Sequence, residues 1–349
     1  QAIMRRVFIS SVISGFEEYR NAARKAVEIM GDKPIMSEGF EARPYSSDVS
    51  CISEVESSDV YVLIMGADYG YLTLEGISVT HKKYLVARKL DKPILAFIQD
   101  CEKEETQVSF QKEVEDYQAG LFRAKFSDPN DLKDEFIKGL RELHLMEQAT
   151  SPGKFKNRIE TALNQIKESS LFDGAELIIA WFPQPTRNID IVTLEEELDE
   201  KFTRMCSNKL AVMRNGYEPQ LNREWTGIKS QNNIIAYFDD GLTFFLLDPI
   251  IKKEGLIFSN NFVPPSRIKE LCSGAYEIFE GNNGWCYIEL ENMDNVFVHE
   301  LPESGNNISL PMTQEVSAYF NKLFIPITQI VYNQWIDMCI NRFKRIFPQ

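Results

Sequence analysis

Short apolar segments alternate with helical patterns along the first 148 residues. Residues 59–66 (DVYVLIMG) are continuously apolar and rich in β-branched side chains, which is typical of a strand buried on both faces of a parallel sheet. Residues 16–30 instead carry apolar side chains at helical spacing, and Gly31 ends that pattern. This alternation predicts an α/β domain with a flavodoxin-like, doubly wound parallel sheet. The five predicted strands are 6–10, 34–36, 59–66, 92–98 and 120–127.

The pattern changes beyond residue 171. A strand is predicted at 175–182, and residues 234–251 resemble a hairpin folded around Asp239-Asp240-Gly241. Residues 312–347 are predicted to be helical, with a break or kink near Pro326. We therefore expect three parts, a first domain over 1–148, a linker helix over 149–170 and a second, α+β domain over 171–349.

Acidic residues outnumber basic ones by 52 to 38, which gives a formal net charge of −14. A protein that binds the backbone of duplex nucleic acid needs clustered Lys and Arg, so duplex nucleic acid is not an expected partner. The sequence has no run of about 18 apolar residues, so a membrane is not expected as a partner either. The 6 cysteines and 3 histidines show no zinc-ligand spacing. We expect a cytoplasmic protein with reduced thiols and without a metal ion.

Polar residues and glycines follow the predicted strands, at the ends where doubly wound sheets bind ligands. They are Ser10, Ser11, Glu38, Gly66, Tyr69, Gly70, Ser78 and Thr80. A strand-to-helix turn with free backbone N–H groups favours an anion. Each residue also has an ordinary structural interpretation, as a helix cap, a turn residue or a solvated carboxylate. If they form a site, Ser10, Ser11, Glu38, Gly66, Tyr69 and Thr80 should converge on one cleft.

Taken together, these segments resemble a TIR-like domain. The resemblance rests on VFISS (7–11), Glu38-x-Phe40, the strand that ends at Gly66 before Tyr69-Gly70, and SVTHKKY (78–84) before KPILAFI. More narrowly, the sequence is similar to a family of unknown function that occurs alone in bacteria or ahead of NACHT, TPR and other STAND-type signalling modules. The motifs cover residues 4–100, and residues 100–145 match by fold only.

The resemblance implies a domain that binds NAD and, in many relatives, cleaves it, with no permanently bound cofactor. It implies ligand contacts at Ser10, Ser11, Phe40, Gly66, Tyr69, Gly70, Ser78, Thr80 and Tyr84. TIR enzymes use a glutamate near the start of the third helix to stabilise the positive charge that develops as nicotinamide leaves. Relatives read Thr-x-x-Glu-Tyr there, whereas this chain places Lys83 before Tyr84. An ammonium group has the wrong sign for that charge.

Three explanations of Lys83 are open. The chain is an engineered inactive variant, it is naturally non-catalytic, or another carboxylate such as Glu38 or Glu75 acts instead. Thr80 is expected near the helix N-cap, which would place Lys83 in the first turn, where a cation opposes the helix dipole. We therefore expect Lys83 to point into the cleft near Ser10 and Glu38. His81 is a candidate general acid or base, but it has no acidic partner nearby in sequence, so we interpret it as a surface residue of this helix.

Two functions from different classes are compatible with these residues. The first is an effector of bacterial antiviral (antiphage) immunity that hydrolyses NAD at the nicotinamide–ribose bond. In this hypothesis the second domain senses an unknown trigger, the protein forms a homo-oligomer, and Lys83 inactivates this chain. The second is a non-catalytic signalling or assembly module that binds a nucleotide or a partner domain.

Overall fold

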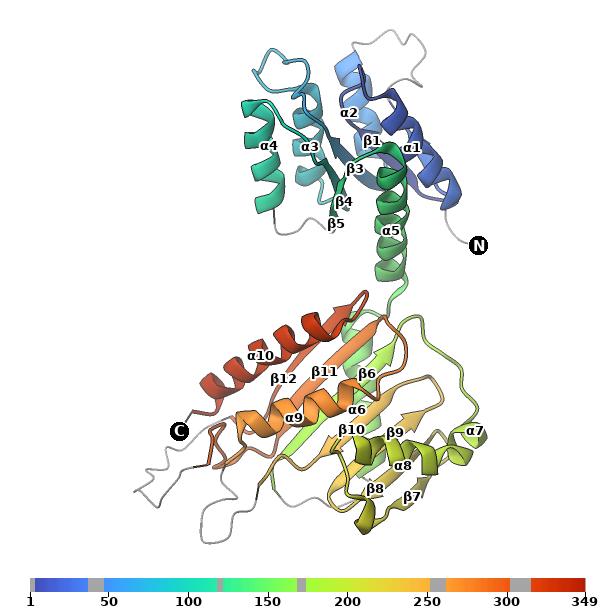
Figure 1. Ribbon diagram of the computed structural model, residues 1–349, viewed down its shortest axis with the longest axis vertical. Coiled ribbons are helices and arrows are strands. Elements are labelled where there is room, and N and C mark those ends of the chain that lie inside the picture. Colours follow the sequence, from blue (N-terminus) through green and yellow to red (C-terminus); the bar gives the residue numbers. More distant parts are fainter. Residues whose placement is uncertain are drawn as a thin grey trace. The chain divides into compact units, whose positions relative to one another are not determined.

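The computed structural model describes residues 4–36, 47–117, 122–167, 174–251, 262–301 and 315–348. The chain divides into two compact units, Gln1–Glu147 and Gln148–Gln349, which are coloured from blue to green and from green to red in Figure 1. Each unit has its own sheet and its own hydrophobic cores.

The described strands of the first unit form a five-stranded parallel sheet in the order β2-β1-β3-β4-β5, as the sequence pattern predicts. The strands are β1 (Arg6–Ser10), β2 (Lys33–Ile35), β3 (Val60–Met65), β4 (Ile94–Gln99) and β5 (Phe122–Phe126). All six residues of β3 are buried, which explains its continuous apolar sequence. The order of the strands reverses between β1 and β3, and in doubly wound sheets the ligand-binding crevice lies at that place, at the carboxyl ends of the strands.

Helices cover both faces of this sheet, which completes the flavodoxin-like arrangement (Figure 1). One face packs against α1 (Glu17–Ile29) and α5 (Pro129–Gln148), whose apolar stripes include Val27 and Phe136. The other face packs against α2 (Ser47–Ser57), α3 (Val79–Lys89) and α4 (Glu105–Asp116). Tyr84 of α3 and Phe110 of α4 lie in that second core.

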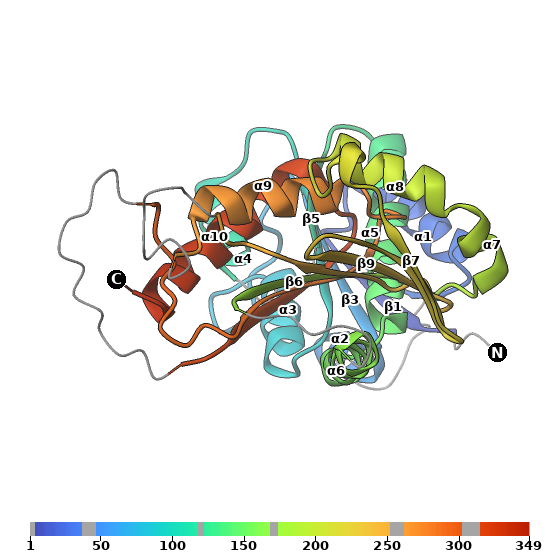
Figure 2. The same cartoon turned by 90° about the horizontal axis from the view of Figure 1, so that it is seen from below.

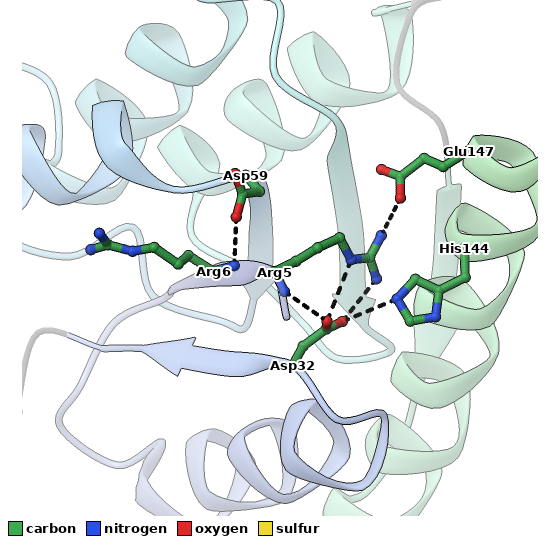
Figure 3. Close-up of polar contacts among 6 residues, drawn as sticks. All are labelled: Arg5, Arg6, Asp32, Asp59, His144 and Glu147. Atoms are coloured by element: carbon green, nitrogen blue, oxygen red, sulfur yellow. Dashed lines mark hydrogen bonds and ion pairs between the residues drawn. The ribbon is translucent and has the colours of Figure 1, made fainter. Parts of the chain in front are cut away.

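A network of charged side chains ties together the amino ends of the strands, at the edge opposite to the crevice (Figure 3). Asp32, which precedes β2, accepts hydrogen bonds from the backbone N–H of Arg5 at 3.1 Å and from its guanidinium Nη2 at 2.8 Å. Two residues from the last turns of α5 complete the network, since His144 lies 3.4 Å from Asp32 and Glu147 lies 2.9 Å from Arg5. Asp59 in the same figure accepts from the backbone N–H of Arg6, which fixes the start of β3 beside β1. These contacts stabilise the fold and leave the carboxyl edge free for other roles.

The second unit is built on a seven-stranded antiparallel sheet in the order β12-β11-β6-β10-β9-β8-β7. The strands are β6 (Glu176–Pro183), β7 (Glu218–Leu221), β8 (Trp225–Ser230), β9 (Asn233–Phe238), β10 (Thr243–Leu247), β11 (Gly284–Glu291) and β12 (Ala318–Phe324). Strands β9 and β10 form the hairpin that the sequence predicts around residues 239–241.

One face of this sheet is covered by four helices and the other by α6 (Pro152–Lys167). The four helices are α7 (Ile191–Glu196), α8 (Leu198–Ser207), α9 (Pro265–Tyr276) and α10 (Gln329–Ile346). Figure 2 shows α8 and α9 on one side of the sheet and α6, seen end-on, on the other. Helix α6 falls within the segment 149–170 expected as a linker helix, and it packs Phe155 and Ile159 on the second sheet.

The prediction of a helix over residues 312–347 is wrong in its first part. Residues Ala318–Phe324 form strand β12, which pairs with β11 over seven positions. Phe320 and Phe324 are four residues apart, a spacing that fits one face of a helix and also one face of a strand. The helix begins only at Gln329, after Thr328 accepts a hydrogen bond from the backbone N–H of Val331. In the described part of the chain, no helix combines the length and apolarity needed to span a bilayer.

Candidate functional site

A small pocket lies at the carboxyl edge of the first sheet. Its polar lining comes from four residues, Asp68 and Tyr69 after β3, Thr80 on α3 and Gln107 on α4. Gly66 and the apolar side chains of Val12 and Phe110 also line it. Its cavity volume is about 10 Å³, which is close to the space that one water molecule needs. The described residues therefore bring Gly66, Tyr69 and Thr80 together, whereas Ser10 and Ser11 are not among the lining residues, so the expected convergence is found only in part.

Ser10 is buried at the end of β1 and does not line the pocket. The Tyr61 hydroxyl of β3 lies 3.5 Å from the backbone oxygen of Thr80. Burial raises the pKa of the Tyr61 phenol well above its ordinary value, and the neighbouring Ser10 hydroxyl opposes that shift. Tyr61 therefore remains a neutral phenol that contacts the first turn of α3.

Ser11 contributes to internal structure. Its Oγ accepts a hydrogen bond from the guanidinium of Arg20 at 2.7 Å and donates one to the backbone oxygen of Val12 at 2.7 Å. Arg20 is only 2 % exposed, so this contact holds a buried cation of α1 against the end of β1. The hydroxyl proton of Ser11 is used within the protein and is not offered to a ligand.

The two glycines of the site allow close packing of the backbone. A Cβ atom on Gly66 would lie 2.6 Å from the Phe16 ring, which is too close for any side chain. Gly70 has a φ of +89°, a conformation that favours glycine, and a Cβ there would lie 3.1 Å from Val12. Both glycines are therefore required by the fold around the pocket.

Helix α3 begins two residues earlier than the sequence suggests. Ser78 is the N-cap, because its hydroxyl accepts a hydrogen bond from the backbone N–H of His81 at 3.1 Å. Thr80 is consequently inside the helix, and Lys83 lies in the second turn rather than the first. The helix-dipole argument for Lys83 is therefore wrong, since that effect falls off within the first turn. Tyr84 follows it in the core, where burial raises the pKa of its phenol.

Lys83 is buried on the face of the sheet beneath α3. Its side chain turns inward, the residue is 7 % exposed, and the ammonium lies 5.7 Å from the ring centroid of Phe8 on β1. Phe8 in turn stacks on Tyr61 at 6.0 Å between ring centroids. Lys82 points the other way and pairs with the exposed Glu75 at 2.9 Å. Glu38 and Phe40 lie outside the described residues, so the expected contact of Lys83 with Glu38 stays a prediction.

His81 is hydrogen-bonded through both ring nitrogens, so its interpretation as a surface residue is wrong. Its Nδ1 lies 2.7 Å from the Tyr69 hydroxyl, and its Nε2 lies 3.0 Å from the carboxylate of Glu113 on α4. Glu113 also accepts a hydrogen bond from Arg88 at 2.8 Å. The sequence could not reveal this acidic partner because it is 32 positions away.

Helix α4 fixes the loop that follows β3. Gln107, which is 4 % exposed, donates a hydrogen bond from its amide to the backbone oxygen of Gly66 at 3.0 Å. The carboxylate of Glu104 accepts from the backbone N–H of Tyr69 at 2.9 Å. Sequence reasoning missed both residues, since neither belongs to a motif and both act across more than thirty positions. The described residues contain no group of three or more His, Cys, Asp or Glu arranged to hold a metal ion.

Comparison with known protein families gives a match over most of the first unit. Residues 6–141 match a protein family described as a domain of unknown function (DUF4062). The match begins at β1 and ends within α5, so it contains the pocket, Lys83 and the His81 contacts. No curated protein matches the chain. The DUF4062 description names no activity, so a function has to be argued from the site itself.

Proposed function

We propose that the first unit is a signalling module that binds NAD or a related nucleotide at the carboxyl edge of its sheet and does not hydrolyse it. The strand order supports the location, because ligands of such sheets bind where the chain reverses direction, here between β1 and β3. Tyr69, Thr80 and Gln107 supply hydrogen-bonding groups at that edge. The TIR-like resemblance supports a nucleotide as the ligand.

The observation that carries this proposal is the buried ammonium of Lys83. Cleavage of the nicotinamide–ribose bond develops positive charge on the ribose, and stabilising that charge requires a carboxylate. Lys83 stands at the position where the resembling family has its glutamate, and its side chain points inward to Phe8. A cation at that position opposes cleavage. Lys83 does not line the pocket, and it attracts the diphosphate of a nucleotide through its charge beneath α3.

The proposed ligand is larger than the pocket. A volume of about 10 Å³ holds one water molecule, so a nucleotide has to displace part of the described wall. The loop after β3 supplies Asp68 and Tyr69 to that wall, and the residues that follow are exposed, with Tyr71 at 86 % and Leu72 at 64 %. Binding should therefore reorder residues 70–77 while Tyr69 and the sheet stay in place.

The second unit is proposed to sense the trigger. It has a separate core and a seven-stranded sheet, and it is joined to the first unit directly after α5. A two-part chain of this kind suits a signalling protein of bacterial antiviral defence in which a sensor changes the assembly of a nucleotide-binding module. The trigger and the homo-oligomer are part of this proposal.

Calorimetric titration with NAD tests the binding step. Lys83→Met keeps the aliphatic stem and removes the charge, and it should weaken binding about ten-fold through loss of attraction to the diphosphate. Lys82→Met is the matched control, because Lys82 pairs with Glu75 on the outside and should leave binding unchanged. Equal affinity of the wild-type and Lys83→Met chains would contradict the assigned role of Lys83.

A second candidate function is NAD hydrolysis with a different carboxylate. The observation that favours it is Asp68, whose side chain lines the same pocket as Tyr69 and Thr80. In that case the wild-type chain releases nicotinamide from NAD, and Asp68→Asn abolishes the release. The two candidate functions therefore differ in whether the wild-type chain releases free nicotinamide.

A further inference from the structure

Four side chains form a continuous hydrogen-bonded chain beside the pocket. The Tyr69 hydroxyl contacts His81 Nδ1 at 2.7 Å, His81 Nε2 contacts Glu113 at 3.0 Å, and the other oxygen of Glu113 contacts Arg88 at 2.8 Å. The residues come from the loop after β3, from α3 and from α4. Tyr69 at the first end lines the pocket, and Glu113 and Arg88 at the other end line an open surface depression.

The surrounding packing holds these groups in one orientation. The His81 ring stacks on Phe110, with 4.0 Å between ring centroids and 20° between planes. Tyr69 meets the same Phe110 edge-on at 6.1 Å, and its backbone is fixed by Glu104. The side chains of His81 and Glu113 are 12 % and 36 % exposed, so this series of hydrogen bonds leads from a buried phenol toward solvent.

The positions of the protons follow from the donors and acceptors. An ionised carboxylate only accepts hydrogen bonds, so Nε2 of His81 must carry a proton toward Glu113. In a neutral imidazole Nδ1 is then an acceptor, and the Tyr69 hydroxyl must donate to it. The Tyr69 oxygen keeps its lone pairs and can only accept a further hydrogen bond. When His81 is protonated, Nδ1 donates to Tyr69, and the phenol proton becomes available to another acceptor.

We propose that His81 sets the direction of the hydrogen bond that Tyr69 offers to a ligand in the strand-end pocket. With neutral His81, Tyr69 accepts and selects a ligand group that only donates, such as an amide or amino N–H of the nucleotide. With protonated His81, Tyr69 donates and selects an acceptor instead. The identity of the ligand rests on the proposed function, whereas the Tyr69–His81–Glu113 arrangement does not.

The groups around His81 determine how it responds to pH. Glu113 on α4 faces Nε2, with Arg88 behind it, and Tyr69 faces Nδ1. Phe110 covers one ring face and carries no charge. On α3 itself, the neighbouring Lys82 is directed outward to Glu75. On α4, Lys112 and Asp116 line the same surface depression as Glu113, together with Tyr117. Burial raises the pKa of the Tyr84 phenol, so this phenol stays neutral. Acidification therefore adds its proton at Nδ1, the nitrogen that faces Tyr69.

Nitrogen NMR of the imidazole rings tests the arrangement without any ligand. The chain has only 3 histidines, so His81→Gln assigns the signals of His81. Above its titration, His81 should be the Nε2–H tautomer with a hydrogen-bonded Nδ1, and Tyr69→Phe should remove that bond. Tyr71→Phe is the matched control, because Tyr71 lies in the same loop and is 86 % exposed. An Nδ1–H tautomer, or a Nδ1 signal that Tyr69→Phe leaves unchanged, would overturn the proposal.

Binding of NAD, measured calorimetrically at pH values at which His81 is neutral and at which it is protonated, tests whether His81 affects ligand affinity. Affinity of the wild-type chain should fall about five-fold on acidification, the equivalent of one hydrogen bond, and Tyr69→Phe should remove this dependence. A pH dependence that persists in Tyr69→Phe contradicts the role of Tyr69. If NAD does not bind at any pH while the NMR result holds, the proposed function fails and the His81 arrangement stands.

Discussion

At the scale of single residues, the buried carboxylate of Asp32 anchors several charged and polar groups. Arg5 and His144 both point at it, and the exposed fraction of its side chain is 2 % (Figure 3). Glu147 contacts the same arginine, yet 44 % of its side chain is exposed. The two acidic residues share Arg5 as a partner, but Asp32 is buried and also accepts from the Arg5 backbone N–H, whereas Glu147 is exposed and accepts from the guanidinium.

We expect Asp32→Asn to lower the free energy of unfolding by about 2–4 kcal/mol, because it leaves a buried guanidinium without its principal counter-charge. Glu147→Gln should cost less than about 1 kcal/mol, since solvent screens that contact. Urea unfolding of both variants measures the difference. Equal losses would show that burial does not decide the strength of this network.

Two carboxylates of the second unit share one ammonium group. Lys167 lies 3.0 Å from Glu176 and 2.7 Å from Glu291, and their side chains are 2 % and 27 % exposed. Burial raises the pKa of Glu176 above its ordinary 4.5, and Lys167 opposes this shift. The folded state therefore binds this proton more tightly than the unfolded state. As a result, Glu176 makes folding less favourable as pH rises from about 4.5 through the raised value.

Glu176→Gln removes this pH-dependent penalty and keeps an oxygen that accepts a hydrogen bond from Lys167. We expect the variant to gain stability relative to the wild-type chain between about pH 4 and about pH 8. Chemical unfolding at both pH values measures the change, with Glu291→Gln as the control that should show little of it. A variant that loses relative stability toward pH 8 would reverse the assigned sign.

At the scale of elements, two helical glycines are placed in opposite surroundings. A Cβ on Gly274 of α9 would overlap the backbone oxygen of Asn208 and would lie 3.1 Å from Leu210. Gly153 of α6 has no atom within 4 Å of the same position. Helix propensity favours alanine at both sites, so packing alone separates them.

Gly274→Ala should therefore destabilise the protein by about 1–3 kcal/mol, because neither a backbone oxygen nor a packed leucine can move away. Gly153→Ala should stabilise it by about 0.5 kcal/mol. Urea unfolding of the two variants measures both changes in the free energy of unfolding, which should have opposite signs. Stabilisation by Gly274→Ala would mean that α9 can shift away from residue 208.

The elements of the first unit could be predicted because buried parallel strands are continuous apolar runs, as in β3. Strand β12 could not be predicted, because the spacing of Phe320 and Phe324 fits a helix and a strand equally well. Only the pairing with β11 decides between the two. The same holds at the site. Its loop residues follow strands and could be found, whereas Gln107 and Glu113 reach it from a helix more than thirty residues away. The helix cap was misplaced because Ser78 and Thr80 are both good capping residues.

At the scale of the whole molecule, the two units should unfold separately. Each has its own sheet and cores, and the chain divides between Glu147 and Gln148. Calorimetry should show two transitions, with Asp32→Asn lowering the midpoint of one and Gly274→Ala that of the other, by roughly 4–8 °C each. A single transition that both variants shift equally would mean that the units unfold as one cooperative body.

The central claim, that the first unit binds a nucleotide and that Lys83 prevents its cleavage, is tested most directly by nicotinamide release. The full chain and Lys83→Glu are incubated with NAD, and free nicotinamide is followed over time. We expect no release by the wild-type chain and measurable release by Lys83→Glu, because the variant restores a carboxylate beside the developing charge. Release by the wild-type chain, or no release by a Lys83→Glu chain that still binds NAD, would contradict the central claim.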